Sequence, residues 1–308
     1  MDTPSSFQTD SLIAEDIDAY LLSHQHKSPI HHGLPAAQPD NPLAGGVRAA
    51  GAGSHRHRTT ERPRMIGRIA WFAALIAVAL VTAMVQIDKQ AETTPALAQI
   101  VPAPLRNYAQ TRITAAALEK GDPEAALAEA ERLIRRRPLP AEYLTLLAAG
   151  QAKAGQEQAA LQTIQIAGQR GWRDPVAQQA VLQLALAAGD KAEASRRYAA
   201  LFLQDRTPDA LLLEVGPAVL GGADATGRDT MVAIVVGGER WHSVFLRRGA
   251  QVMPPAAFAA ITANSFARGA QFDCNMLKVS VGALAKRDAG AAGTLRTAAL
   301  KRCPKLPA

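Results

Sequence analysis

The sequence predicts an all-α protein in which a single N-terminal transmembrane helix precedes an α-solenoid, a stack of short helices. Three observations support this fold class. The run from Ile69 to Val85 contains no charged side chain. Gly121, Gly155 and Gly189 recur every 34 residues and each opens a similar segment. Alanine makes up about a fifth of the chain while only 5% of residues are aromatic, which favours closely packed helices over sheets.

The first expected element is a transmembrane helix at residues 66–87. About nineteen apolar helical residues span roughly 28 Å, close to the hydrocarbon thickness of a bilayer. A cleaved signal peptide with its site near Ala98 is the alternative, although the apolar run is longer than a usual signal core. The basic residues that precede the run are Arg56, Arg58, Arg62, Arg64 and Arg68. By the positive-inside rule they keep residues 1–64 in the cytoplasm and place residues 88–308 in the periplasm, giving a single-pass inner-membrane protein.

Residues 1–64 are expected to form a mostly disordered cytoplasmic tail. Residues 29–64 are rich in Pro, Gly, His and Arg and bury too little apolar surface to offset chain entropy. A short amphipathic helix is expected from Ser11 to Leu22. His-x-His pairs can ligate metals, but solvated imidazoles in a disordered tail are favoured, so no metal site is predicted. The histidines of the tail are His24, His26, His31, His32, His55 and His57.

The stretch TDSLIAEDIDAYLLSHQHKS, from Thr9 to Ser28, resembles the N-terminal leader of the GTPase subunit of bacterial sulfate adenylyltransferase. The resemblance implies a role related to sulfate activation. In that family a G-x-x-x-x-G-K-[ST] phosphate loop follows directly, whereas this chain has none, so nothing cradles nucleotide phosphates. One hypothesis is that the tail is a fusion or start-site artefact and that translation begins at Met65.

Residues 88–106 are interpreted as a linker and residues 107–220 as helical repeats. After each of the three periodic glycines a small residue follows at the fifth position, namely Ala126, Ala160 and Ala194. From about Asn107 to Pro208 this pattern resembles the tetratricopeptide repeat family. The resemblance implies helix-turn-helix units, with the glycine in the turn and the alanine where the two helices touch.

Proline positions add to this resemblance. Pro138 stands where the family often ends its second helix, and Trp172 and Arg206 stand there in the other two units. Pro175 and Pro208 lie nearby and are expected to end those helices, because proline lacks the donor that continuation needs.

Solenoids of this kind bind peptides or protein surfaces along their concave face. The Lys/Asn/Arg set by which some members of the family clamp a terminal carboxylate does not recur in this chain, so polar contacts with a protein segment are expected instead. The repeat positions place the following side chains on that face: Tyr108, Thr111, Glu142, Thr145, Lys153, Gln179 and Gln183.

Residues 221–308 are interpreted as degenerate repeats that form a basic, helical cap. Met231 to Val236, followed by two glycines, is compatible with a strand, whereas the later apolar residues recur every three to five positions, as on helices. The spacing of small, packing and terminating positions returns near the end, at Ala292, Ala299 and Pro304.

Both cysteines lie in this cap. Cys274 is expected to open one helix and Cys303 to end the next, so antiparallel packing can bring them together as a disulfide in an oxidising compartment. A catalytic thiol assisted by His242 is the alternative.

The net charge of +7 falls on residues 221–308, which contain twelve basic and five acidic side chains. A periplasmic location argues against nucleic acid as a partner and favours anionic lipid headgroups or acidic polysaccharide. Solvated helix faces are the simpler interpretation. The basic residues are Arg228, Arg240, Arg247, Arg248, Arg268, Lys278, Lys286, Arg287, Arg296, Lys301, Arg302 and Lys305.

These features predict a membrane-anchored scaffold that binds other cell-envelope proteins. An accessory factor for export or assembly of an anionic envelope polysaccharide is the alternative. The chain contains no G-x-S-x-G, H-E-x-x-H, C-x-x-C or phosphate-loop motif, so neither an enzyme nor a cofactor is expected.

Overall fold

The computed structural model describes residues 62–304 and residue 306. These residues form thirteen α-helices and three short 3-10 helices, and no strand occurs among them. The expected helix from Ser11 to Leu22 and the six tail histidines lie outside the described residues. The chain divides into two compact units, one ending at Arg112 and the other beginning at Ile113.

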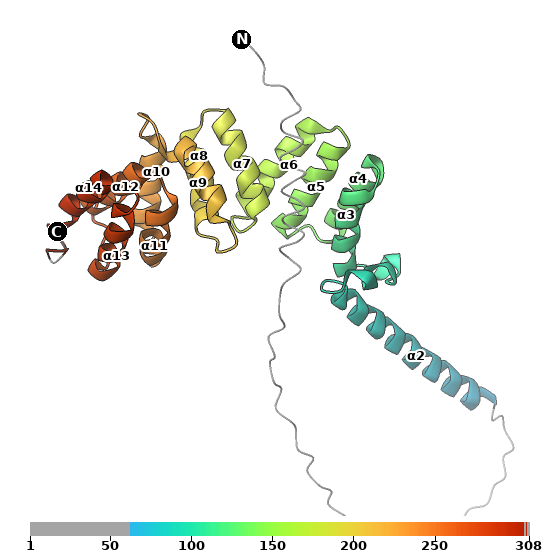
Figure 1. Cartoon of the computed structure of the whole chain (residues 1–308). Helices are drawn as coiled ribbons and strands as arrows, with labels where there is room; N and C mark the ends of the chain where they lie inside the picture. Colours follow the sequence, from blue (N-terminus) through green and yellow to red (C-terminus); the bar gives the residue numbers. More distant parts are fainter. Residues whose placement is uncertain (1–61, 305, 307–308) are drawn as a thin grey trace, which may run out of the picture. The chain divides into compact units, whose positions relative to one another are not determined.

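Helix α2 (Arg62–Gln90) contains the expected membrane segment. An 18-residue window within Ile66–Gln90 has a mean hydropathy of 2.2, and this window is not buried against the other described residues. Leucine, isoleucine, valine and aromatic side chains are exposed along the helix. This helix is long and apolar enough to cross a membrane (Figure 1).

The segment expected to be a linker, residues 88–106, is folded. It contains the end of α2 and two 3-10 helices, η1 (Pro95–Gln99) and η2 (Ala103–Leu105). Asp88 is buried, and its carboxylate accepts hydrogen bonds from the backbone N–H groups of Asn107, Tyr108 and Ala109 at 2.9–3.0 Å. One carboxylate at the end of α2 thus accepts hydrogen bonds from the free N–H groups at the start of the following α-helix, Tyr108–Lys120.

Twelve further α-helices follow in the described part of the chain and form six successive pairs. The first helices of the pairs are α3 (Tyr108–Lys120), α5 (Ala141–Lys153), α7 (Pro175–Ala187), α9 (Asp209–Leu220), α11 (His242–Val252) and α13 (Cys274–Ala285). The second helices are α4 (Pro123–Arg136), α6 (Glu157–Arg170), α8 (Lys191–Phe202), α10 (Thr226–Gly237), α12 (Pro255–Ala267) and α14 (Ala289–Ala299). A third 3-10 helix, η3 (Glu239–Trp241), precedes α11.

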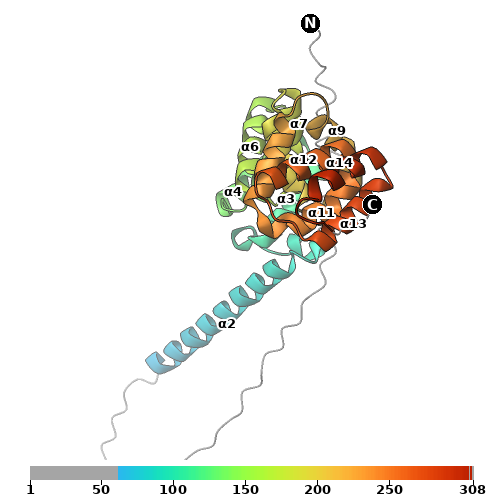
Figure 2. The same cartoon turned by 90° about the vertical axis from the view of Figure 1, so that its left-hand side faces the viewer.

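These helices stack in chain order (Figure 1). Helices α5 and α6 pack closely, as do α7 and α8. Further along, α8, α10, α12 and α14 lie side by side in one layer, and α9, α11 and α13 lie side by side in the other. Figure 2 views this stack from its C-terminal end.

The periodic small residues occupy the turns and contacts of these pairs. Gly155 and Gly189 lie between the two helices of a pair and have φ angles of +72° and +73°, a left-handed conformation that glycine adopts without steric cost. Gly121 occupies the corresponding turn between α3 and α4. The alanines that follow, Ala126, Ala160 and Ala194, are all buried.

A fourth unit escaped the sequence pattern. Gly222, with φ of +76°, lies between α9 and α10, 33 rather than 34 residues after Gly189. Its small residue, again five positions on, is the buried Gly227. A Cβ atom at Gly227 would lie 2.2 Å from the carbonyl oxygen of Val219, so no larger residue fits.

Two prolines act differently from expectation. Pro138 follows the end of α4, as expected. Pro175 and Pro208 were expected to end helices, but Pro175 is the first residue of α7 and Pro208 is the N-cap of α9. Proline suits a helix start because its missing N–H would be unpaired there in any case.

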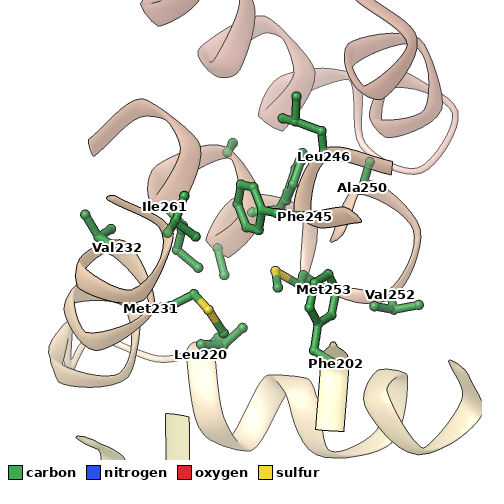
Figure 3. Close-up of a cluster of buried hydrophobic side chains, with 14 of the residues drawn as sticks. Phe202, Leu220, Met231, Val232, Phe245, Leu246, Ala250, Val252, Met253 and Ile261 are labelled. Carbon is green, nitrogen blue, oxygen red and sulfur yellow. The ribbon is translucent and has the colours of Figure 1, made fainter. Parts of the chain in front are cut away.

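The C-terminal cap is helical and continues the stack. Met231–Val236 lies within α10, so the strand alternative is wrong. One hydrophobic cluster runs from Leu182 on α7 to Leu306, without a break at residue 220. Figure 3 shows its centre, where Phe245, Met253 and Ile261 meet side chains from α8, α9 and α10.

The earlier helices share smaller clusters. Leu118, Leu133 and Leu146 join α3, α4 and α5, with alanines filling the remaining contacts. Ile164 packs with alanines from α5, α6 and α7. The aromatic residues of the core are therefore concentrated in the later half of the stack, where phenylalanine rings contact one another.

Candidate functional site

The side chains predicted to face a partner occupy different environments. Tyr108 and Thr111 lie in the first half of α3, within the N-terminal unit. Glu142 on α5 and Gln179 on α7 are half-buried, and Gln183 on α7 is exposed. The two remaining residues of the set, Thr145 and Lys153, have hydrogen-bond partners within the protein.

Thr145, predicted to lie on the concave face, is buried and bonds Asp174. The Thr145 hydroxyl donates to the Asp174 carboxylate, whose other oxygen accepts from the N–H groups of Val176 and Ala177 at 3.1 and 3.3 Å. Asp174 is thus the N-cap of α7 and is only 1% exposed. Burial raises the pKa of Asp174 above its usual value, against the lowering effect of the Thr145 hydroxyl.

Lys153 also has an internal role. Its ammonium group donates to the carbonyl oxygen of Leu118 at 2.6 Å, in the last turn of α3. The last carbonyls of a helix have no partner within the helix, and a cation there also suits the helix dipole. Lys153 therefore joins α5 to the end of α3 and is not a free contact for a partner.

The same device recurs along the stack. Arg197 on α8 donates to the carbonyl of Gly168 near the end of α6 at 2.6 Å. Lys191 donates to Ala218 near the end of α9, and Arg228 donates to Leu220 at 2.9 Å. Arg287 donates to Ala250 and Met253 at the end of α11, each at 2.9 Å. Several cations of the basic cap are thus committed to helix ends.

Arg248 on α11 makes the densest set of these contacts. Its guanidinium donates to the carbonyls of Phe202 and Gln204 at 2.6 and 2.9 Å, and to that of Thr207. It also bonds the carboxylate of Asp209 at 2.8 Å. Arg248 therefore fixes the loop that joins α8 to α9 against α11.

A polar pocket of about 470 Å³ lies beside this loop. It is open to solvent and is bounded by the α8–α9 loop, the first residue of α9 and one face of α11. We call it the loop pocket. It is lined by Asp205, Arg206, Thr207, Pro208, Asp209, Val244, Arg247, Arg248 and Gln251.

The polar groups of the loop pocket are unevenly satisfied. Arg248 and Asp209 pair with each other, whereas Arg206 and Arg247 have no ion-pair partner among residues 62–304. Thr207 is only 4% exposed, and its hydroxyl has no hydrogen-bond partner in the described part of the chain. A buried hydroxyl without a partner costs free energy, so Thr207 carries an unmet hydrogen-bonding capacity beside the pocket.

The sequence did not point to this pocket. In the sequence, Arg206 stands out only as the residue that replaces a proline of the repeat pattern. Arg247 stands out only as one of the basic residues of the C-terminal region. Thr207 and Gln251 carried no signal. Bringing residues 205–209 beside residues 244–251 needs the register of α8, α9 and α11, which the pattern of single residues does not contain.

The cysteines and His242 form no catalytic pair. The sulfur atoms of Cys274 and Cys303 lie at disulfide-bonding distance with Cα atoms 5.7 Å apart, as expected from the sequence, and neither cysteine is free. His242 is buried, with Nδ1 2.9 Å from the carbonyl oxygen of Gln271 and Nε2 2.9 Å from that of Val235. Its ring links α10, α11 and the segment before α13.

No group of three or more His, Cys, Asp or Glu side chains that could hold a metal ion occurs among the residues described. Comparisons of the chain with known protein families, with curated proteins and with solved structures find no match.

Proposed function

We propose that the protein is a membrane-anchored scaffold whose helical stack, a solenoid of the tetratricopeptide type, lies in the periplasm and binds other envelope proteins. The observation that carries this proposal is a stack of twelve successive helices attached to a helix long and apolar enough to cross a membrane. Stacked helix pairs offer extended surfaces for protein segments. The cysteine pair at disulfide-bonding distance supports an oxidising compartment.

The proposed topology keeps the tail in the cytoplasm and exports residues 88–308. It rests on the arginines that precede the apolar run Ile69–Val85 and on the scarcity of basic residues directly after that run. The stack is then tethered at one end of the chain, which restricts its partners to proteins of the same membrane and the adjacent periplasm.

In-cell photocrosslinking tests the scaffold role. A photoreactive residue at Gln183, which is exposed on α7, should crosslink the full chain to one or a few envelope proteins. The matched control is Gln165, which is exposed on α6, a second helix of a pair. Partners found at both positions alike, or at neither, would contradict a binding face on the first helices.

The second candidate is an accessory role in the export or assembly of an anionic polysaccharide. It is favoured by the cap residues Lys278, Lys286, Lys301 and Arg302, which are exposed. Binding of the full chain to a polyuronate, weakening steeply between 50 and about 300 mM salt, would support it, because exposed charge pairs are screened over that range. Binding to proteins alone would favour the scaffold.

A further inference from the structure

We propose that the loop pocket binds a single carboxylate group, the side chain of an aspartate or glutamate on a segment of a partner protein. This inference rests on the proposed scaffold role and names the chemistry by which one partner is recognised. None of the residues that the repeats predict to face a partner lines this pocket.

The first argument is that side chains that can donate hydrogen bonds line the pocket. Arg206 and Arg247 bring two guanidinium groups that have no ion-pair partner among the described residues, and both line the pocket. Gln251 adds a side-chain amide. A guanidinium presents a planar fork of N–H groups that matches the two oxygens of a carboxylate, which makes arginine suited to this ligand.

The second argument is the hydroxyl of Thr207. It belongs to a residue that is 4% exposed, lines the pocket and has no hydrogen-bond partner among the described residues. Nearly all buried polar side-chain atoms in proteins are paired, so the Thr207 hydroxyl is a group that gains a hydrogen bond if a ligand reaches it from the pocket. A carboxylate bound by the two arginines offers an oxygen that can accept a hydrogen bond from this hydroxyl.

The third argument comes from the start of α9. Its N-cap is Pro208, which offers no side-chain acceptor, so no capping side chain covers the first N–H groups of the helix. Pro208 and Asp209 line the same pocket. Free N–H groups and the positive end of the helix dipole add to the preference for a negative group.

The mixed charge of the pocket decides between a peptide and a polyanion. Asp205 also lines the pocket and has no ion-pair partner among the described residues. A polysaccharide with a charge on every sugar would place further negative groups near Asp205, where like charges repel. In a peptide, backbone N–H groups flank the one carboxylate, and the carboxylate of Asp205 can accept hydrogen bonds from them.

The test uses the full chain in lipid nanodiscs and a fluorescent peptide with blocked ends, Gly-Ala-Glu-Ala-Gly. Its control peptide carries glutamine in place of glutamate. Fluorescence anisotropy should show saturable binding of the glutamate peptide at least about tenfold tighter than the glutamine peptide, the size expected for a charge-assisted contact. Equal binding of the two peptides, or no saturable binding of either, would overturn the proposal.

Three variants place the binding in the loop pocket. R206Q/R247Q should weaken the glutamate peptide about tenfold or more. T207V should weaken it about fivefold while leaving the thermal midpoint unchanged or higher, because the hydroxyl it removes has no protein partner. The control R240Q/R302Q removes the same charge outside the pocket and should change affinity less than about twofold.

If R240Q/R302Q loses as much affinity as R206Q/R247Q, the peptide binds to the net positive charge of the protein. That result would overturn the loop pocket as the binding site. A uronate oligosaccharide that binds with the same dependence on Arg206, Arg247 and Thr207, while the peptide does not bind, would overturn the choice of a protein ligand. Envelope-protein crosslinks at Gln183 without peptide binding would refute the pocket alone. Peptide binding without any crosslink at Gln183 would refute the binding face predicted on the first helices and leave the pocket in place.

Discussion

Asp174 illustrates how a single buried carboxylate can set local structure in this protein. It caps α7 through two backbone N–H groups and accepts the Thr145 hydroxyl of α5, so it fixes one helix start against a neighbouring helix. These bonds compensate only part of the cost of removing a charge from water. The raised pKa of Asp174 expresses the remaining cost.

The pH dependence of folding should report this cost. Because the pKa of Asp174 is higher in the folded than in the unfolded chain, the folded chain holds a proton that the unfolded chain has released at pH values just above 3.8. The contribution of Asp174 to stability therefore falls as pH rises through that window. In D174N this dependence should vanish, while the amide oxygen still caps α7.

Urea unfolding of the full chain in micelles, followed by circular dichroism from pH 4 to pH 8, measures the difference between wild type and D174N. The stability of wild type relative to D174N should decrease with rising pH. A relative stability that increases with pH would contradict the direction of the pKa shift. D174A, which loses the cap, should cost about 1–2 kcal/mol.

Glycine has opposite roles at two exposed positions. Gly189 has a φ of +73° and no atom near its missing Cβ, so an alanine there is disfavoured by backbone conformation alone. G189A should lower the free energy of unfolding by about 1 kcal/mol. Gly282, inside α13, also has open space around it but no positive φ. G282A should therefore raise the free energy of unfolding by about 0.5–1 kcal/mol. Equal signs for the two variants in thermal unfolding would refute this reasoning.

At the scale of the element, the ends of the helices are the distinctive feature. Lys153, Arg197 and Arg287 each donate to carbonyls at the end of a helix in another pair. Free carbonyls at a helix end need a partner, and these side chains supply it while joining one pair to the next. The basic residues therefore contribute to packing as well as to surface charge.

Arg248 and Arg247 provide a matched pair to test this. Arg248 bonds three carbonyls and Asp209, and its side chain is 15% exposed, whereas Arg247 is exposed. R248M should lower the free energy of unfolding by about 2–3 kcal/mol because several acceptors lose a charged donor. R247M should change it by less than about 0.5 kcal/mol. Similar losses in both variants, measured by urea unfolding, would mean that the carbonyl contacts contribute little.

The cysteine pair links the two ends of the last helix pair, α13 and α14. It joins the start of α13 to the residues after α14, across a sequence separation of 29. Cross-linking a loop of this length restricts the unfolded chain, which should be worth about 3–4 kcal/mol. C274S/C303S, or wild type under reductant, should unfold at correspondingly lower urea concentration. Reductant should have no effect on the double variant, and any effect there would point to a cause other than the cysteine pair.

Sequence periodicity predicted the elements well where the chain repeats strictly. The turns at Gly155 and Gly189 are where the spacing placed them. The unit with Gly222 was missed because its spacing is 33 and its small residue is Gly227 rather than alanine. The pairs α11–α12 and α13–α14 have no glycine in their turns, so the spacing of apolar residues, and near the end that of Ala292, Ala299 and Pro304, indicates that they are helices.

The candidate site was much less predictable. The repeat pattern assigns positions to faces by analogy, but whether Thr145 faces solvent or Asp174 depends on how deeply α7 packs against α5. The loop pocket depends on Arg248 drawing residues 202–209 onto α11. Such contacts join residues about forty positions apart and leave no periodic trace in the sequence.

At the scale of the whole molecule, topology is the property on which the proposed function depends. A periplasmic reporter enzyme, alkaline phosphatase, fused after Ala308 should be active, and the same enzyme fused before Met1 should be inactive. Replacing the arginines at positions 56, 58, 62, 64 and 68 with glutamine should reduce the C-terminal activity, because orientation follows the positive residues. An active N-terminal fusion in the wild type would exclude the proposed orientation.

The hydrogen bonds between pairs also bear on how such a protein can change over evolution. Many helical repeat proteins gain or lose whole units, since each unit contacts only its neighbours through similar surfaces. Here Lys191 needs the carbonyl of Ala218, Ser195 needs that of Gly227 at 2.7 Å, and Arg248 needs Thr207. Deleting α9 and α10 would remove the acceptors of Lys191 and Ser195 on α8. Loss of this unit would therefore leave two donors of α8 without their present acceptors unless further substitutions accompanied it.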